Sequence, residues 1–197
     1  VTRLLTPGTQ ALRPSAAAPG QWSVRAIHEA RHLLGLLPRR RLFLLGSPIA
    51  QSQSPLIHNT GFQVLGLPHV YERFETSTVD ERLVQLLHAP DFGGASVTIP
   101  LKLSIMQLLD SISPEAQVIG AVNTIVPRRD SDTGRVALHG ENTAWHAIYD
   151  RARAAHVRSD GLVALVMGAG GSARAALYAL QRVGASAILL DTGPSGT

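Results

Sequence analysis

The chain has no cysteine, a single lysine and no long apolar run. The lack of cysteine excludes disulfide bonds and thiolate metal sites. No apolar run reaches the roughly 18 residues that a membrane-spanning helix needs, so we expect no membrane segment. Arg3 and Pro7 interrupt the N-terminal apolar stretch, so the layout of a signal peptide is absent. These features predict a soluble cytoplasmic protein.

The shortage of lysine draws attention to the one that is present. Of 18 basic residues, 17 are arginines and the remaining one is Lys102. Arginine cannot release a proton near neutral pH, whereas a lysine with a lowered pKa can. Lys102 is therefore a candidate for proton transfer, and the alternative is chance or a packing role. The only tight basic run, residues 39–41, fits a solvated corner, so we expect no direct nucleic-acid binding.

Strand and helix patterns alternate from residue 41 onward, which predicts an α/β fold. Before them, residues 6–20 indicate a loop, and a helix is expected from Ser23 to Pro38. The expected strands are 42–45, 70–74, 95–98, 122–127, 136–138, 162–167 and 187–190, and the expected helices are 55–66, 79–87, 101–109, 143–155 and 172–183. We predict an open, mostly parallel sheet that forms a substrate-binding domain. The start of a truncated Rossmann-like nucleotide domain follows it.

A glycine-rich turn lies between the last two expected strands. Gly168, Gly170, Gly171 and Ser172 precede a helix, where backbone can approach a diphosphate and the helix N-terminus favours an anion. The alternative is a tight turn that needs small residues.

Asp191 ends the next strand, where a carboxylate would bind the ribose of NAD and repel the 2′-phosphate of NADP. The alternative is an aspartate that starts a turn. Because only two strands of this domain fit before Thr197, we expect weak or no dinucleotide binding.

Three polar segments, 52–59, 96–102 and 120–124, fall near strand ends or helix starts. Loops at these places carry ligand groups in α/β proteins. Hydroxyl, amide and amine groups suit a small polyhydroxylated acid. The candidate binding residues are Ser52, Ser54, Thr98, Lys102 and Asn123. The structural alternatives are helix capping before Pro55 for the two serines, a strand position for Thr98 and a turn for Asn123.

In order and spacing, these segments resemble the signature of the shikimate dehydrogenase family: Ser-x-Ser-Pro, Val-Thr-x-Pro-x-Lys, Gly-Ala-Val-Asn-Thr and then the glycine-rich turn. The resemblance implies that the five candidate residues bind shikimate or quinate and that Lys102 is catalytic. It also implies NADP or NAD as cofactor, and no metal. Ser96 stands where bacterial members usually have Asn.

One position departs from the family pattern, which continues Gly-x-Asn-Thr-Asp. Here Ala144 follows Asn142 and Thr143. The family's aspartate pairs with the lysine and bonds the reacting hydroxyl, and a methyl group can do neither. Losing such an acid–base partner typically costs about 10²–10⁴-fold in rate. Glu141 is near in sequence, but three positions earlier it is expected to point elsewhere.

The N-terminal segment carries a second resemblance. Residues 17–21, which end at Gln21, and the helix after them are similar to the end of a type I 3-dehydroquinase barrel. That layout resembles the fungal pentafunctional AROM polypeptide and the fungal quinate repressor. We therefore expect a dehydroquinase-like tail and linker at 1–40, a substrate-binding domain at 41–141, and a connecting helix with an incomplete nucleotide domain at 142–197.

Three hypotheses follow. Our main one, favoured by Ala144, is a non-catalytic shikimate- or quinate-binding domain of a quinate-repressor-like regulator, which would contact an activator protein and could act in the nucleus. The alternative, favoured by Lys102 and the glycine-rich turn, is the dehydrogenase domain of an AROM-like enzyme that reduces 3-dehydroshikimate to shikimate. The third, suggested by the stop at Thr197, is an inactive remnant.

Overall fold

The computed structural model describes residues 20–130, 132–154 and 161–193. Its strands are β1 (Arg41–Gly46), β2 (Val70–Glu75), β3 (Phe92–Val97), β4 (Ser111–Ile112), β5 (Thr124–Arg129), β6 (Val136–Glu141), β7 (Val163–Met167) and β8 (Ala187–Asp191). Its helices are α1 (Val24–Leu33), α2 (Ser54–Leu65), α3 (Glu81–Leu87), α4 (Leu101–Ser104), the 3₁₀ helix η1 (Ile105–Leu108), α5 (Pro114–Ile119), α6 (Ala144–Ala154) and α7 (Gly171–Val183). Residues 6–19 of the loop expected at 6–20 lie outside the described residues, as do Ser131 and Ala155.

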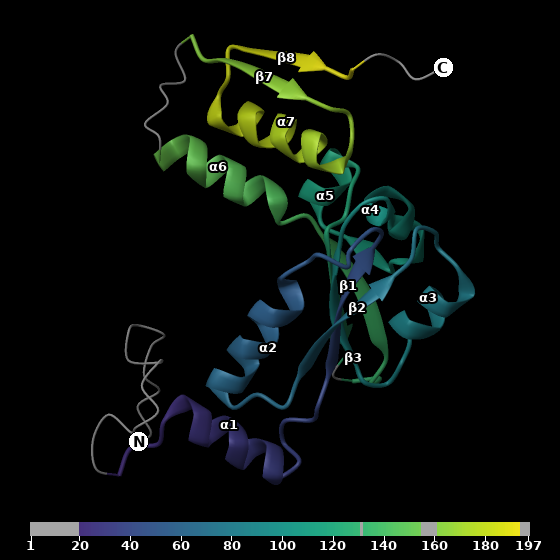
Figure 1. The fold of residues 1–197 in the computed structure, drawn as a ribbon, viewed down its shortest axis with the longest axis vertical. Coiled ribbons are helices and arrows are strands. Elements are labelled where there is room, and N and C mark those ends of the chain that lie inside the picture. The colour runs from purple at the N-terminus through teal and green to yellow at the C-terminus, as the bar shows by residue number, and fades with distance from the viewer. Residues whose placement is uncertain (1–19, 131, 155–160, 194–197) are drawn as a thin grey trace.

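Six strands form one sheet in the order β2-β1-β3-β5-β6-β4. Figure 1 labels β1, β2 and β3 of this sheet. Strand β1 runs parallel to both β2 and β3, and β4 runs parallel to β6. Strand β5 is antiparallel to both of its neighbours. The mostly parallel α/β sheet predicted from the sequence is therefore confirmed, with one antiparallel hairpin where paired strands were expected.

The sheet is covered by apolar packing on both faces. The larger core cluster joins strand residues such as Leu45 and Val97 to Leu83 of α3 and Leu101 of α4, all at most 3% exposed. On the other face, α2 packs through His58, whose ring stacks on Tyr71 with centroids 4.3 Å apart. The burial on both faces explains why these strands are short apolar runs rather than alternating ones.

A second unit follows the sheet, in which β7 and β8 pair in parallel and pack on α7 (Figure 1). Apolar residues of α5, α6 and α7 join this unit to the first one. The buried members of that cluster are Ile119, Ala121, Trp145, Ala175 and Ala179. The strand–turn–helix–strand order is that of the expected Rossmann-like start.

The structure differs from the expectation in three places. The helix expected at 101–109 is one turn of α-helix followed by a 3₁₀ turn, and β4 and α5 were not expected. Helix α5 nevertheless has an ordinary start, because the Ser113 hydroxyl accepts from the Ala116 N–H and Pro114 takes the first position. No helix in the described ranges combines the length and apolar character that crossing a bilayer requires.

Candidate functional site

The expected ligand segments meet at one edge of the sheet, which we call the polar edge. It comprises the loops that follow β1 and β3 and the residues that precede β5. Backbone hydrogen bonds hold these loops together. Ser47 N–H donates to the Ile99 carbonyl at 2.9 Å, and Val97 N–H donates to the Asn123 carbonyl at 2.7 Å. Chain segments far apart in sequence are thereby brought to the same end of the parallel strands, where α/β proteins bind ligands.

The two serines sit side by side at the start of α2. The Ser52 hydroxyl accepts from the Ser54 N–H at 3.2 Å and donates to the Ser54 hydroxyl at 3.1 Å. Arg73 of β2 donates to the Ser52 carbonyl at 2.5 Å, a contact that sequence reasoning missed. The pair therefore has a structural role in the turn before the helix, and it presents two hydroxyls at the polar edge.

Thr98 follows β3 and is placed by a close backbone approach. Its N–H donates to the Leu45 carbonyl at 2.8 Å, and its methyl group occupies the space in which a side chain at Gly46 would lie. Gly46 has a φ of 148°, so both its conformation and its lack of a Cβ are needed here.

Lys102 lies in the single turn of α4 and contacts both units of the chain. Its carbonyl accepts from the Val122 N–H at 2.8 Å, while its amine donates to the Ser172 hydroxyl at 3.1 Å. Burial lowers the pKa of Lys102 below its usual 10.5, because taking the charged ammonium out of water is unfavourable. The amine is thus shifted toward the form that can accept a proton.

Gly171 shows how closely the second unit approaches the lysine. A Cβ at this position would lie 3.1 Å from both the Lys102 Cδ and the Ala121 Cβ. Any larger residue would require these neighbours to shift, so glycine lets helix α7 begin close against the polar edge, and that start carries Ser172 to the amine. The glycine-rich turn therefore has a packing function in addition to the one predicted from the sequence.

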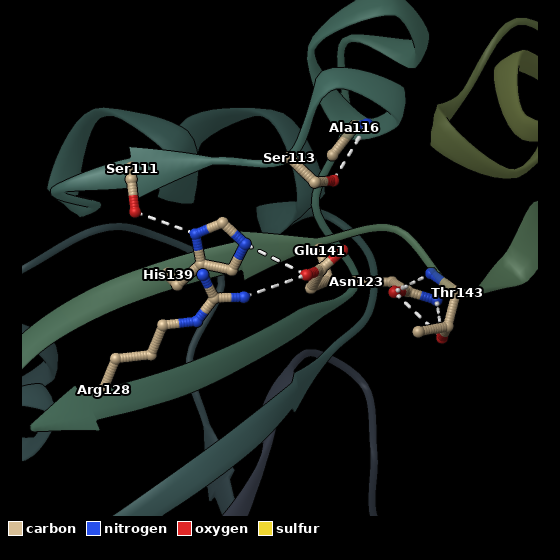
Figure 2. A network of polar contacts seen from close by, with 8 residues as sticks. All are labelled: Ser111, Ser113, Ala116, Asn123, Arg128, His139, Glu141 and Thr143. Atoms are coloured by element: carbon tan, nitrogen blue, oxygen red, sulfur yellow. Dashed lines mark hydrogen bonds and ion pairs between the residues drawn. The ribbon is translucent and has the colours of Figure 1, made fainter.

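Asn123, which precedes β5, stabilises the polar edge through side-chain hydrogen bonds to Thr143 (Figure 2). Its side-chain oxygen accepts from the Thr143 N–H at 2.9 Å, and its amide nitrogen donates to the Thr143 hydroxyl at 3.2 Å. The buried Asn142 similarly donates to the Ala121 carbonyl at 2.9 Å. The local role of Asn123 is more elaborate than the turn that we considered as an alternative.

Ala144 occupies the first position of α6 and packs against the cluster that joins the two units. Its N–H donates to the side-chain oxygen of Asn142 at 3.1 Å. The backbone needed for a carboxylate at this position is therefore intact, and only the side chain is missing.

Glu141 is engaged in a different network (Figure 2). Its carboxylate lies 2.9 Å from His139 Nε2 and 3.4 Å from a guanidinium nitrogen of Arg128. The Ser111 hydroxyl lies 2.8 Å from the other ring nitrogen of His139. These contacts engage the Glu141 carboxylate with His139 and Arg128, and none of them involves Lys102. The alternation of His139 and Glu141 along one strand was a signal that could have revealed the network.

The glycine-rich turn has room for an anion. Gly168 has a φ of 109°, and a Cβ at Gly168 or Gly170 would meet nothing within 4 Å. Helix α7 has 13 residues and no acidic side chain in its first turn, so its N-terminal positive potential is not neutralised there. These features fit the diphosphate of a dinucleotide.

Asp191 lies beside this turn, because its carbonyl accepts from the Gly168 N–H at 2.7 Å. Its carboxylate accepts from the Gly193 N–H at 2.9 Å, as an aspartate that starts a turn does. The ribose-binding alternative remains a prediction. Within the described ranges, no group of three or more metal-binding side chains is gathered in one place.

Comparison with known proteins agrees with this geometry. Residues 44–125 match the family model of the shikimate dehydrogenase substrate binding domain. Over this stretch the chain is similar to the shikimate dehydrogenase substrate binding domain. The matched region runs from β1 into β5 and includes every residue that we placed at the polar edge from the sequence.

The similarity extends beyond this region in longer proteins. The pentafunctional AROM polypeptide of Malassezia globosa is 68% identical over 96% of this chain, and the chain spans 12% of its length. The dehydroquinate dehydratase and shikimate dehydrogenase from S. pombe AroM is 50% identical over 90% of this chain and 33% of its own, with a TM-score of 0.72.

A bacterial structure is also similar. The shikimate 5-dehydrogenase from Thermus thermophilus, in complex with NADP(H) and shikimate, is 35% identical. It covers 78% of this chain and 56% of its own, with a TM-score of 0.63. The resemblance to shikimate dehydrogenases and AROM polypeptides noted from the sequence is confirmed.

Proposed function

We propose that the chain forms the substrate-binding part and the cofactor-facing turn of a shikimate dehydrogenase within an AROM-type polypeptide. The observation that carries the proposal is the position of Lys102. Its amine lies at the polar edge, it is shifted toward its neutral form by burial, and it contacts the turn that fits a dinucleotide. The AROM relatives favour this reading over the regulatory hypothesis that Ala144 suggested.

In this proposal the polar edge binds shikimate. Ser52, Ser54, Thr98 and Asn123 supply hydroxyl and amide groups for its ring hydroxyls and carboxylate, and they orient it toward Lys102. The neutral amine takes the proton of the reacting hydroxyl, and the protonated amine returns it in the reverse direction. Ser172 holds the amine at the boundary between the two units.

The dinucleotide, NADP or NAD, supplies the hydride acceptor when it is bound. Gly168, Gly170 and Gly171 leave space for its diphosphate, and the start of α7 offers N–H groups. Asp191 stands near the turn, where a carboxylate would favour NAD. The bacterial relative in complex with NADP(H) instead supports the phosphorylated cofactor. A complete nucleotide domain is needed for tight binding.

Ala144 is expected to limit the rate. Lys102 works without the carboxylate that would orient it, so turnover suffers more than binding. Ala144→Asp in the AROM-type polypeptide should raise kcat for shikimate oxidation by about 10²–10⁴-fold and change the shikimate Kd only slightly. The aspartate would lie in the first turn of α6, where a negative charge is favourable.

A matched pair of variants tests whether Lys102 performs the proton transfer. Lys102→Arg keeps the positive charge but cannot release a proton near neutral pH, and Lys102→Met removes both. We expect both to abolish turnover with NADP, while Lys102→Arg retains more shikimate binding in calorimetry. Turnover by either variant at the unmodified rate would overturn the proposal.

A second candidate function remains, because Ala144 removes the acid–base partner. It is a ligand-binding domain without turnover that senses shikimate or quinate and transmits this to an activator protein, in the cytoplasm or nucleus. Here quinate should bind as tightly as shikimate, and Ala144→Asp should restore no activity. A pull-down with and without quinate distinguishes this function from an inert remnant.

A further inference from the structure

A cavity lies at the opposite end of the sheet from the polar edge. It has a volume of about 400 Å³, within the range of small-molecule sites. Its walls come from the residue before β1, the end of α3 and the loop that follows it, the starts of β3 and β6, and the end of β5. The lining includes Arg40, Leu87, Phe92, Pro127, Arg129 and Leu138.

The cavity exists because the sheet opens between β3 and β5. These strands pair only through Ala95–Ile125 and Ser96–Thr124, whereas β5 and β6 share six residue pairs. Pro127 has no N–H to continue the ladder toward β3. On the other side, the β1–β3 register shifts at Gly93. The opening is therefore built into the two strands and does not depend on a loop conformation.

The floor of the cavity is apolar. Leu87, Phe92 and Leu138 belong to the main core and are at most 5% exposed. Pro127 and Val136 continue this surface toward the rim, and Val136 is 40% exposed. Because the floor side chains expose little area, a ligand would mainly cover Val136 and Pro127, and it would gain roughly 25 cal/mol per Å² of apolar area removed from water.

The rim is cationic. Arg40 donates to the Pro90 carbonyl at 2.6 Å, and Arg129 donates to the Gly134 carbonyl at 2.7 Å. Backbone carbonyls hold both guanidiniums in place without neutralising them, and each has five N–H donors in total. Among the described residues that line the cavity there is no aspartate or glutamate, and His88 adds a third nitrogen-containing side chain.

We propose that this cavity binds a small apolar carboxylate, with an aromatic or branched hydrocarbon body against Pro127 and Val136 and its carboxylate at Arg40 and Arg129. An apolar floor, two guanidiniums and the lack of a lining carboxylate are together complementary to that class of ligand. The site is separate from the polar edge and does not depend on dehydrogenase activity. It gives the chain a place where an aromatic or branched acid can bind without competing with shikimate.

The probe for this site is 3-phenylpropanoate, and its neutral amide, 3-phenylpropanamide, is the matched control. Backbone amide NMR of the complete chain should show shifts at Gly93, Phe92 and Leu138 during titration with the acid. We expect a Kd of about 0.1–1 mM, as is typical of so small a ligand. The amide should bind at least about tenfold more weakly, because it lacks the charge.

Two neighbouring arginines provide the control on the protein side. Arg129→Gln should weaken binding of the acid about tenfold, whereas Arg128→Gln removes the same charge from the residue that contacts Glu141 and should leave binding unchanged. Val136→Trp, which fills the cavity, should abolish binding. Equal binding of acid and amide, an equal effect of the two arginine variants, or shifts confined to the polar edge would each overturn the proposal.

Discussion

The two sheets of this chain place similar apolar strands in different surroundings. In the six-stranded sheet, Leu45 of β1 is fully buried between helices on both faces. In the two-stranded sheet, Leu165 of β7 is 62% exposed, and Val163 and Met167 on the same face are exposed as well. Helix α7 covers only one face of β7 and β8 in the described residues. An apolar strand therefore predicts buried side chains only when other elements cover both faces of its sheet.

The largest effect should come from comparing the same substitution in the two sheets. Leu45→Ala should lower the free energy of unfolding by about 2–5 kcal/mol, because it removes buried contacts and leaves a cavity. Leu165→Ala should change it by less than about 0.5 kcal/mol, since this side chain is mostly in water already. Urea denaturation of both variants measures the difference, and equal losses would contradict this account of the two sheets.

A smaller effect is expected where the two units touch. Gly171→Val places atoms against Lys102 and Ala121, so it should cost about 1–3 kcal/mol of stability through overpacking. Gly170→Ala is the control, because a Cβ there meets nothing within 4 Å and the residue has an ordinary φ of −74°. If both substitutions were tolerated equally, the contact between the units would be looser than the structure shows.

The smallest effect concerns the Lys102 amine. Ser172→Ala removes an acceptor that stabilises the charged ammonium, so the pKa of Lys102, already lowered by burial, should fall further. At any pH near the titration, the variant should have more neutral amine than the unmodified chain. Because the chain has one lysine, selective isotope labelling gives a single side-chain NMR signal to titrate. An unchanged or raised pKa would show that the Ser172 contact does not act on the charge.

Much of the sheet was predictable because its strands are short apolar runs with turn residues between them. The hairpin of β5 and β6 followed from the turn-rich residues between its strands. Strand β4 was missed because its two residues carry no period and pair with β6 far along the sequence. Helix α5 had a readable signal in Ser113 and Pro114, but six residues are too few for a helical pattern to stand out.

The candidate site was predictable as a set of residues but not as a set of contacts. The polar segments identified Lys102 and the glycine-rich turn separately, by the chemistry of their side chains. Their contact joins positions 70 residues apart, and it depends on how α7 packs on Ala121, which no local pattern encodes. The cavity between β3 and β5 could not be predicted either, because Pro127 and Gly93 open the sheet only where these two strands lie side by side.

The backbone hydrogen bonds of the polar edge determine which of its side chains can be replaced without loss of the fold. Main-chain groups hold its loops together, as in the bonds from Ser47 to Ile99 and from Val97 to Asn123. A side chain of the polar edge that makes no local hydrogen bond of its own can therefore be exchanged without dismantling the scaffold. Ala144 illustrates this, because its N–H still donates to Asn142 although the family's carboxylate is absent. Under the proposed function, we expect such a surface to change its rate or its preferred acid by single replacements while the fold stays the same.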